Sequence, residues 1–524
     1  MGVRFEMNSA SFPDLTLLTA LPFFAAIILA GIDFSRRGLA RGIALGSSLL
    51  TLAHALCLWT RFNPALNEMQ FVEKHAWISS LGVDYFLGAD GLSILMLLLT
   101  AIVTPAAIVA AWKIESRAPL YFSLILFLQA GLIGTFTAQN FFHWFLFWEL
   151  ALIPAFFLIK LWGGPGRGPA AMQFFIYTMV GSVAMLLGFL GLYLITNTFN
   201  FPELAEIVRK GRLTGLINIS PILPGINNDE GVAKVLFWCV FLGLAVKVPL
   251  MPFHGWLPPA YSEAPTSTTM LLTGVMSKMG VYGFLRLLLP IFPEQIRESM
   301  NLLLLLAIAT IVFGALAAFG ERDLKRLLGF SSISHLGYCL LGIFASATLA
   351  ENGLKLEKAA ALNGVLLQMF GHGITAATLF FLVGYLEDRN KGRRSIDDFG
   401  GLRQVSPILA GLMGIALFAS LGLPGLNGFP AEFLIFRGVF PLATWAGALA
   451  AFGLFVTATY ILRIIHHVFN GPLSDNHIVV GDLRFSERVV VIPAVLLMFA
   501  LGFFPQILIG LFNTTVTRLV EGLS

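Results

Sequence analysis

Four ionisable residues stand in apolar surroundings, where a charge would be far from water. Lys247 ends a long apolar run, and Glu149, Lys278 and Glu432 lie within similar segments. A lysine at the bilayer centre costs about 2.5–3.5 kcal/mol on insertion scales. Because packing gives little reason to retain such residues, their default interpretation is a path for ions or protons. A carboxylate favours the protonated form of a nearby lysine, so Glu149 is interpreted as the partner of Lys247.

Three of these positions also have a structural interpretation. Glu149 could cap a helix break elsewhere in the fold, and Lys247 precedes prolines and could bind the carbonyls that a break frees. Glu432 follows a cluster of glycines and prolines and could accept hydrogen bonds from freed amides. Arg286 and Lys160 lie near the ends of apolar segments, so we expect both to extend to the membrane surface.

Three histidines could connect the charged positions. His335 and His372 lie in apolar segments, and histidine titrates near neutral pH and can relay protons. A lone membrane histidine is equally often a hydrogen-bonded core residue, so both interpretations stay open. His254 lies just after a run of prolines, where a structural hydrogen bond is expected as readily. A bis-histidine haem is disfavoured because the histidines lack paired helical spacing.

The composition is that of a polytopic membrane protein. Of 524 residues, 57% are hydrophobic and only 12% are charged. The three cysteines are isolated, and no Cys-x-x-Cys motif exists, so we expect no iron–sulfur or zinc site. The glycine-rich stretch 163–169 lacks the Gly-Lys-Ser/Thr of a nucleotide loop. We therefore expect no cofactor or metal on this chain, and the net charge of +4 indicates no nucleic-acid partner.

The predicted fold class is an all-α polytopic membrane protein with about fourteen transmembrane helices in one membrane domain, 1–524. Segments of about 20 apolar residues recur along the whole chain. Two of the segments are too long and are interrupted by proline and glycine, which break helices. The predicted spans are 13–32, 39–60, 89–112, 119–138, 140–162, 170–196, 232–261, 264–290, 300–320, 323–346, 358–386, 406–436, 441–469 and 486–513, of which 232–261 and 406–436 are the broken ones.

Basic residues in alternate loops predict the orientation. If the count of spans is right, most of these loops lie on one side, which is then cytoplasmic and places both termini on the other side. Arg209, Lys210 and Arg212 fall on the opposite side, and residues 200–212 resemble a short surface helix. The basic residues on the predicted cytoplasmic side are Arg36, Arg37, Arg41, Lys160, Arg167, Arg322, Lys325, Arg326, Arg389, Lys391, Arg393, Arg394 and Arg403.

The polar positions also suggest an internal repeat. The separation between Glu149 and His335 is nearly the same as that between Lys247 and Glu432. This predicts a first repeat over 119–290 and a second over 300–470. Each would have five spans, an odd number, so the second must be inverted relative to the first, with one broken helix in each. Inverted repeats with paired broken helices are typical of transporters.

Several motifs resemble one known family. Residues 247–258, Lys-Val-Pro-Leu-Met-Pro-Phe-His-Gly-Trp-Leu-Pro, continue into Ala-Tyr-Ser-Glu-Ala-Pro-Thr at 260–266. Together with Lys278, they are similar to the proton-translocation module of antiporter-like complex I subunits and multisubunit cation/proton antiporters. Asp90-Gly-Leu-Ser, Phe-Trp-Glu149 and the stretch from Leu324-Lys-Arg to Ser-His335 fit the same family. The resemblance covers nearly the whole chain.

Within that family, the chain resembles subunit M of bacterial NADH-quinone oxidoreductase. The resemblance implies a proton-translocating membrane subunit of an enzyme whose redox and nucleotide sites lie on other subunits. By the same resemblance, Glu149 and Lys247 form a modulating pair, Lys278 is the central carrier, and His335 and His372 connect it to Glu432. The implied partners are protons, the lipid bilayer and the neighbouring subunits L and N, in the bacterial inner membrane. Two alternatives remain: a subunit of a multisubunit Na⁺/H⁺ antiporter, or of a membrane-bound hydrogenase complex.

Overall fold

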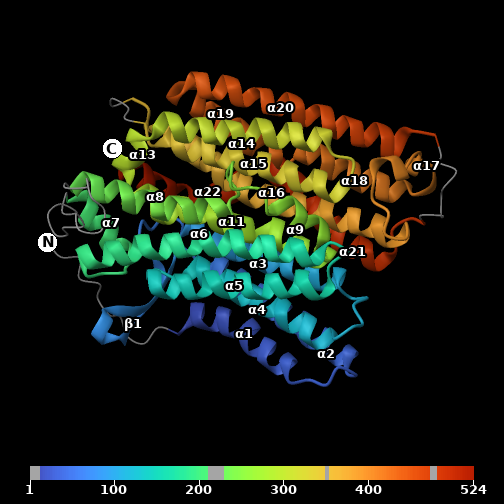
Figure 1. Ribbon diagram of the computed structural model, residues 1–524, viewed down its shortest axis with the longest axis horizontal. Coiled ribbons are helices and arrows are strands. Elements are labelled where there is room, and N and C mark those ends of the chain that lie inside the picture. The colour runs from blue at the N-terminus through green and yellow to red at the C-terminus, as the bar shows by residue number, and fades with distance from the viewer. Residues whose placement is uncertain (1–11, 211–228, 349–352, 473–480, 524) are drawn as a thin grey trace.

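The computed structural model describes residues 12–210, 229–348, 353–472 and 481–523. Long helices lie side by side along the longest axis of the molecule (Figure 1). Within the described part of the chain, eleven helices are long and apolar enough to cross a membrane. This confirms the all-α membrane fold, whereas the number of fourteen spans stays a prediction.

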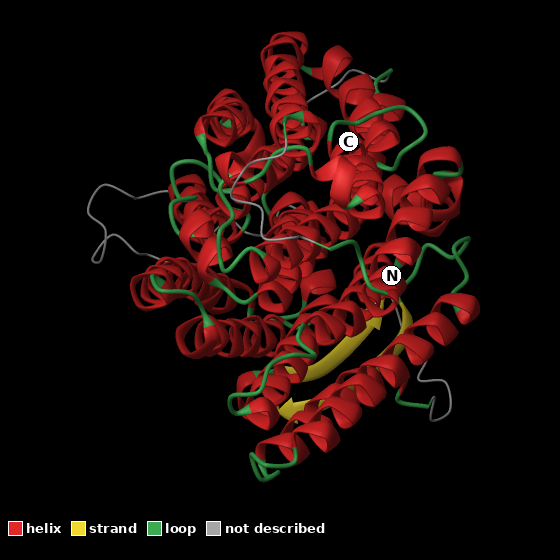
Figure 2. Ribbon diagram, turned by 90° about the vertical axis from the view of Figure 1, so that its right-hand side faces the viewer, coloured by secondary structure: helices red, strands yellow, loops and turns green. Residues whose placement is uncertain are grey.

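The N-terminal part holds three helices, which lie at predicted spans. It also holds a β-hairpin, which the sequence analysis did not predict. The strands pair antiparallel around Gly82, whose φ of +60° suits glycine. Seen from one end of the molecule, the strands are drawn in its lower part, with helices on both sides of them (Figure 2). The bounds are α1 Asp14–Ala30, α2 Arg37–Arg61, β1 Gln70–Ile78, η1 Ser79–Leu81, β2 Val83–Ala89 and α3 Gly91–Ala110.

The middle of the chain forms the first group of helices around a broken one. The helix over 266–291 is continuous in space but contains two π-helical turns, η2 and η3, on either side of Lys278. Such turns are frequent at functional sites. The bounds are α4 Ala118–Thr137, α5 Phe141–Trp162, α6 Arg167–Thr196, α7 Phe201–Arg209, α8 Asp229–Lys247, α9 Leu257–Glu263, α10 Thr266–Leu271, η2 Leu272–Met276, α11 Ser277–Gly283, η3 Phe284–Leu288 and α12 Leu289–Ile291.

A second group of helices follows, and it also contains a helix break, between α18 and α19. The bounds are α13 Pro293–Glu298, α14 Met300–Gly320, α15 Leu324–Ser346, α16 Lys355–Arg389, η4 Ile396–Asp398, α17 Leu402–Val405, α18 Pro407–Ser420, α19 Gly428–Leu442, α20 Thr444–Ile464 and η5 Ile465–Asn470.

Both predicted helix breaks are confirmed. α8 ends at Lys247, and the chain resumes a helix only at Leu257, after the proline-rich segment. α18 ends at Ser420, and α19 starts at Gly428, with Gly422 and Gly425 at positive φ between them. These breaks have a local cause, because proline cannot donate and glycine readily adopts left-handed backbone.

The C-terminal span was predicted wrongly as one helix over 486–513. The structure has two helices, α21 Phe485–Phe503 and α22 Gln506–Glu521. Phe504 has φ −126° and ψ 58°, outside the helical region, because it precedes Pro505. The predicted helix near 200–212 is confirmed as α7 up to Arg209, whereas Arg212 lies outside the described residues.

Candidate functional site

Lys247 is buried at the end of α8, only 2% exposed. Its Nζ lies 4.9 Å from the centroid of the Trp148 ring and has no hydrogen-bond partner among the described residues. The structural interpretation of Lys247 is therefore wrong, because other groups use the carbonyls near the break. Trp256 Nε1 donates to the Val246 carbonyl over 2.8 Å. Lys247 thus presents its ammonium group to the face of an aromatic ring, an attractive cation–π contact.

Glu149 follows Trp148 on α5 and is partly buried. Its Oε1 is buried and has no hydrogen-bond partner in the described part of the chain, so it caps no helix there. Its carboxylate interacts electrostatically with Lys247. Among the described residues, however, the two side chains do not form an ion pair within 4 Å. Trp148 itself is held by a 3.0 Å hydrogen bond from Nε1 to Ser182 Oγ. The structure therefore brings Glu149 and Lys247 into electrostatic contact without closing the pair.

Close packing at glycines brings the helix of Lys278 against the helix of Lys247. A Cβ on Gly280 would lie 2.7 Å from Val248 Cγ2, and one on Gly283 would lie 2.4 Å from Leu244 Cδ2. Small residues allow membrane helices to approach this closely. The ends of α8 and α11 thus place the two lysines on directly contacting helices.

Lys278 is fully buried and bonded to two groups. Its Nζ donates to the Thr273 carbonyl in the π-helical turn η2. The same Nζ lies 2.8 Å from Nδ1 of His372 on α16. The helices meet closely here, since a Cβ on Gly373 would lie 2.7 Å from the Gly274 carbonyl.

The connection continues from His372 to Glu432. The rings of His372 and His335 have centroids 5.2 Å apart. His335 Nδ1 lies 3.4 Å from Glu432 Oε1, and its Nε2 lies 3.0 Å from Ser420 Oγ. The structural interpretation of Glu432 is therefore wrong, since the partner found for its carboxylate is a histidine and not a backbone amide. A small cavity of about 10 Å³ is lined by His335, His372 and Glu432. This is close to the space that one water molecule needs.

Two further polar residues of this cluster were missed by the sequence analysis. Gln368 Nε2 lies 3.3 Å from His335 Nδ1, and Ser420 contacts the other ring nitrogen. One signal was available for Gln368. It precedes His372 by four residues on one helix, so both project from the same face. Nothing in the sequence singled out Ser420.

Gly422 makes room for Glu432. A Cβ at this position would lie 2.6 Å from Glu432 Oε2, and the φ of Gly422 is +77°. The break between α18 and α19 therefore places backbone, rather than a side chain, against the carboxylate.

His254 belongs neither to the Glu149–Lys247 pair nor to the series from Lys278 to Glu432. Its Nδ1 has no hydrogen-bond partner among the described residues, and it contacts none of the other predicted site residues through a hydrogen bond or ion pair found there. Lys160 is exposed near the end of α5, as expected of a residue at the membrane surface.

The prediction for Arg286 was wrong, because this side chain points inward and is only 8% exposed. It makes two hydrogen bonds to Asp90, of 2.8 and 2.6 Å, and Arg518 of α22 donates to the same carboxylate over 2.9 Å. Burial raises the pKa of Asp90, but the two guanidinium groups outweigh it and lower the pKa to about 2. No local sequence pattern indicates this ion pair, because its members are far apart along the chain.

Arg394, in the segment 387–403 that follows α16, joins three helix ends. It donates to Asp323 over 2.6 Å, to Glu387 over 2.7 Å and to the Ser262 carbonyl over 2.8 Å. This segment thus ties the second half of the broken helix α8–α9 to the start of α15 and the end of α16.

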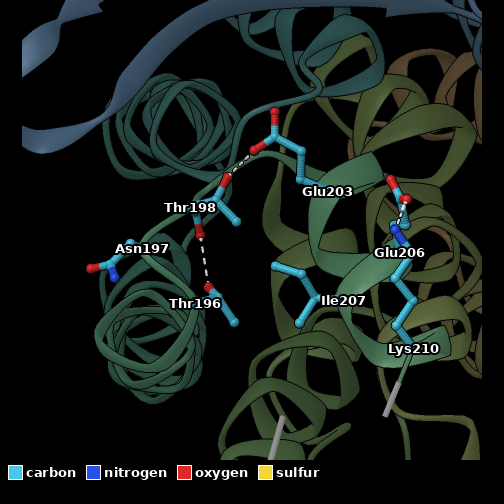
Figure 3. Close-up of a pocket in the computed structure, with 7 residues that line it drawn as sticks. All are labelled: Thr196, Asn197, Thr198, Glu203, Glu206, Ile207 and Lys210. Atoms are coloured by element: carbon cyan, nitrogen blue, oxygen red, sulfur yellow. Dashed lines mark hydrogen bonds and ion pairs between the residues drawn. The ribbon is translucent and has the colours of Figure 1, made fainter. Parts of the chain in front are cut away.

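Another pocket lies elsewhere, beside α7, with a volume of about 350 Å³ (Figure 3). None of the predicted site residues lines it. Its carboxylates are already engaged, Glu203 by Thr198 and Glu206 by Lys210. Among the described residues there is also no group of three or more His, Cys, Asp or Glu side chains that could hold a metal ion.

Known proteins are similar to this chain in both sequence and fold. The profile of the family described as NADH:quinone oxidoreductase/Mrp antiporter, TM, matches residues 138–458. The NADH-quinone oxidoreductase subunit M of Rhodobacter capsulatus is 35% identical, over 97% of this chain and 96% of that protein. A chain of respiratory complex I from Thermus thermophilus superposes with a TM-score of 0.82 at 30% identity, covering 97% of this chain and 100% of that one.

A chain of the Mrp complex from Dietzia sp. DQ12-45-1b has the same TM-score of 0.82 but only 22% identity, over 98% of this chain and 99% of that one. That likeness shows the fold alone, so the antiporter alternative is less well supported than subunit M. The same family is indicated by the buried lysines, by the broken helices and by relatives at this level of identity. The chain belongs to the family of NADH-quinone oxidoreductase subunit M, an integral multi-pass membrane subunit of a proton-translocating enzyme.

Proposed function

We propose that this chain moves protons across the bacterial inner membrane along Glu149, Lys247, Lys278, His372, His335 and Glu432. Electron transfer from NADH to quinone in other subunits drives the movement. The observation that carries the proposal is the close series from Lys278 Nζ to Glu432 through two neighbouring imidazoles, whose ring centroids lie 5.2 Å apart. Imidazole accepts a proton on one nitrogen and releases one from the other, so this series can conduct protons.

The open Glu149–Lys247 pair supplies the control step. An ion pair closed to about 4 Å is worth roughly 4 kcal/mol at an effective dielectric constant of 20. Moving one proton against the membrane potential costs about 2.3 kcal/mol per 100 mV. Opening and closing this pair therefore changes the free energy of protonating Lys247. The change is large enough to drive a proton from Lys278 toward His372.

The broken helices support the predicted inverted repeats over 119–290 and 300–470. Lys247 ends the first half of α8–α9, and Glu432 lies just inside the second half of α18–α19. The two residues thus occupy corresponding breaks, and in transporters such breaks lie near the middle of the membrane.

The lateral partners in this proposal are subunits L and N, with both termini on the non-cytoplasmic side. Support comes from the solved relative, which is a chain of respiratory complex I, and from the apolar outer surface. Helix α6 exposes Ile176, Val180, Leu187 and Leu194, side chains suited to lipid or to another membrane subunit.

The test replaces Glu149 or Lys278 by alanine in the assembled complex. We expect NADH-driven proton uptake into inverted membrane vesicles to be abolished, with the amount of assembled complex unchanged on native gels. Lys160→Ala is the control, because Lys160 is an exposed lysine on the same helix as Glu149. Pumping at the parent rate in either Glu149→Ala or Lys278→Ala would refute the proposed path.

A further inference from the structure

The ring of His335 has three polar neighbours for its two nitrogen atoms. Nε2 lies 3.0 Å from the hydroxyl of Ser420. Nδ1 lies 3.3 Å from Nε2 of Gln368 and 3.4 Å from Oε1 of Glu432. His335 is 2% exposed and Gln368 is 3% exposed, so bulk water cannot replace either neighbour. Two groups of different chemistry therefore approach the same ring nitrogen.

These two neighbours require opposite protonation of Nδ1. The amide nitrogen of Gln368 can only donate, so its hydrogen bond needs a lone pair on Nδ1. An ionised carboxylate can only accept, so Glu432 bonds to Nδ1 only when that nitrogen carries a proton. Among the described residues, the hydrogen bond of Nδ1 is the one with Gln368, whereas Glu432 stands at ion-pair distance. This contact assigns the proton of a neutral His335 to Nε2, which faces Ser420.

Hydrogen bonds between α16 and the break before Glu432 fix the place of Gln368. Gln368 lies on α16 and lines the small cavity together with Glu432. Asn427, in the break between α18 and α19, donates from Nδ2 to the Gly371 carbonyl over 2.9 Å and to Thr375 Oγ1 over 3.1 Å. The amide of Gln368 is thus held at a defined position relative to the carboxylate.

We propose that Gln368 is a positioning residue that favours release of a proton from His335 to Glu432 and hinders its return. This inference rests on the proposed function. In the step, the Nδ1–H bond of a charged imidazolium breaks and its electron pair stays on Nδ1. The proton forms an O–H bond with Glu432 Oε1. His335 ends neutral with its proton on Nε2, and Glu432 ends as a neutral carboxylic acid.

The amide of Gln368 stabilises only the state after this step. Its N–H group donates into the lone pair that the departing proton leaves on Nδ1, and it has no acceptor there while the proton is still bound. One hydrogen bond of ordinary net strength shifts such an equilibrium by about two- to tenfold. While the amide occupies Nδ1, the proton on Glu432 also lacks an acceptor on His335.

The test compares Gln368→Leu with Gln368→Glu in the assembled complex, measured as proton uptake per NADH oxidised in inverted vesicles. Leucine removes the donor, so we expect the ratio to fall by about two- to tenfold. Glutamate keeps the shape of the side chain but supplies an acceptor that holds the Nδ1 proton, so the ratio should fall further.

Gln139→Leu is the matched control. Gln139 is a buried glutamine in the connection between α4 and α5, and its Nε2 donates to the Gly88 carbonyl over 3.2 Å. The control loses a buried amide and a hydrogen bond of nearly the same length as that of Gln368. It should pump like the parent.

The order of the two Gln368 variants separates this role from simple packing. If Gln368 only filled space, the isosteric Gln368→Glu would pump better than Gln368→Leu, and that order would overturn the proposal. Parent-like uptake in Gln368→Leu would overturn it as well. His335→Gln, assayed in parallel, tests the path itself. Loss of pumping in His335→Gln with parent-like Gln368→Leu leaves the path standing without the role of Gln368, whereas normal pumping in His335→Gln shows that the path is wrong.

Discussion

The Nζ of Lys278 lies 2.8 Å from Nδ1 of His372, although the two residues are 94 positions apart in the chain. This contact joins the helix that carries the central lysine to the second group of helices. One helix therefore takes part in both halves of the site. It packs against the end of α8 at Gly280 and Gly283, and against α16 at Gly274.

His372→Gln should interrupt the transfer of protons from Lys278 to His335. The amide can still hydrogen-bond to Lys278, but it cannot pick up and release a proton as imidazole does. We expect NADH-driven proton uptake to fall by about 100-fold or more. His254→Gln is the control, since His254 lies outside the path. Equal loss in both variants would show that the effect is not specific to the path.

Glu432→Gln should block the last step, from His335 to the carboxylate 3.4 Å away. The amide keeps the shape of the side chain but cannot accept the proton. We expect an assembled complex with pumping reduced by about 100-fold. Glu357→Gln removes another partly buried carboxylate, in the first turn of α16, and should leave proton uptake per NADH unchanged.

Gly422→Ala should impair pumping with every titratable residue still present. The new Cβ would lie 2.6 Å from Glu432 Oε2 and would force alanine into a backbone region with φ +77°. Displacing a reacting group by about 1 Å can cost up to about 100-fold in rate. Gly414→Ala in α18 is the control, since nothing lies within 4 Å of its added Cβ. The two variants are compared by vesicle proton uptake at equal complex content, and similar uptake would count against this placement of Glu432.

Asp90→Asn should destabilise the subunit, because it leaves Arg286 buried without its carboxylate. Removing one partner of a buried ion pair costs roughly 3–5 kcal/mol. The effect depends on pH in a defined way. A carboxylate whose pKa is lowered from 3.8 to about 2 stabilises the fold fully above its ordinary pKa, and this contribution is lost as the pH falls through about 2. The deficit of the variant should therefore be constant near neutral pH and shrink in strong acid.

Thermal unfolding of the purified complex measures this deficit. Asp388→Asn is the control, since its partner Lys113 is 3.8 Å away and both side chains are exposed. An exposed pair of this kind contributes about 0–1 kcal/mol. A melting temperature for Asp90→Asn as high as that of Asp388→Asn would contradict the structural role of the Asp90–Arg286 pair.

The positions of most helices and both breaks could be predicted from the sequence, because their causes are local. Apolar runs of bilayer length form spans, and prolines and glycines end them wherever they occur. The burial of Glu149, Lys247, Lys278 and Glu432 followed from the same logic, since each lies inside an apolar run. Local patterns failed at Pro505, where one apolar stretch holds two helices, and at the hairpin of β1 and β2.

Which side chains meet was decided only by the tertiary structure. Arg286 was expected at the membrane surface, because its position near a helix end carries no information about the distant Asp90 that neutralises it. Glu149 and Lys247 were expected as partners, but only the packing showed Trp148 against the lysine and the pair left open. Lys278 meets His372 because Gly274 and Gly373 let two helices touch backbone to backbone. Such contacts depend on the faces that distant helices turn toward each other, which no local pattern encodes.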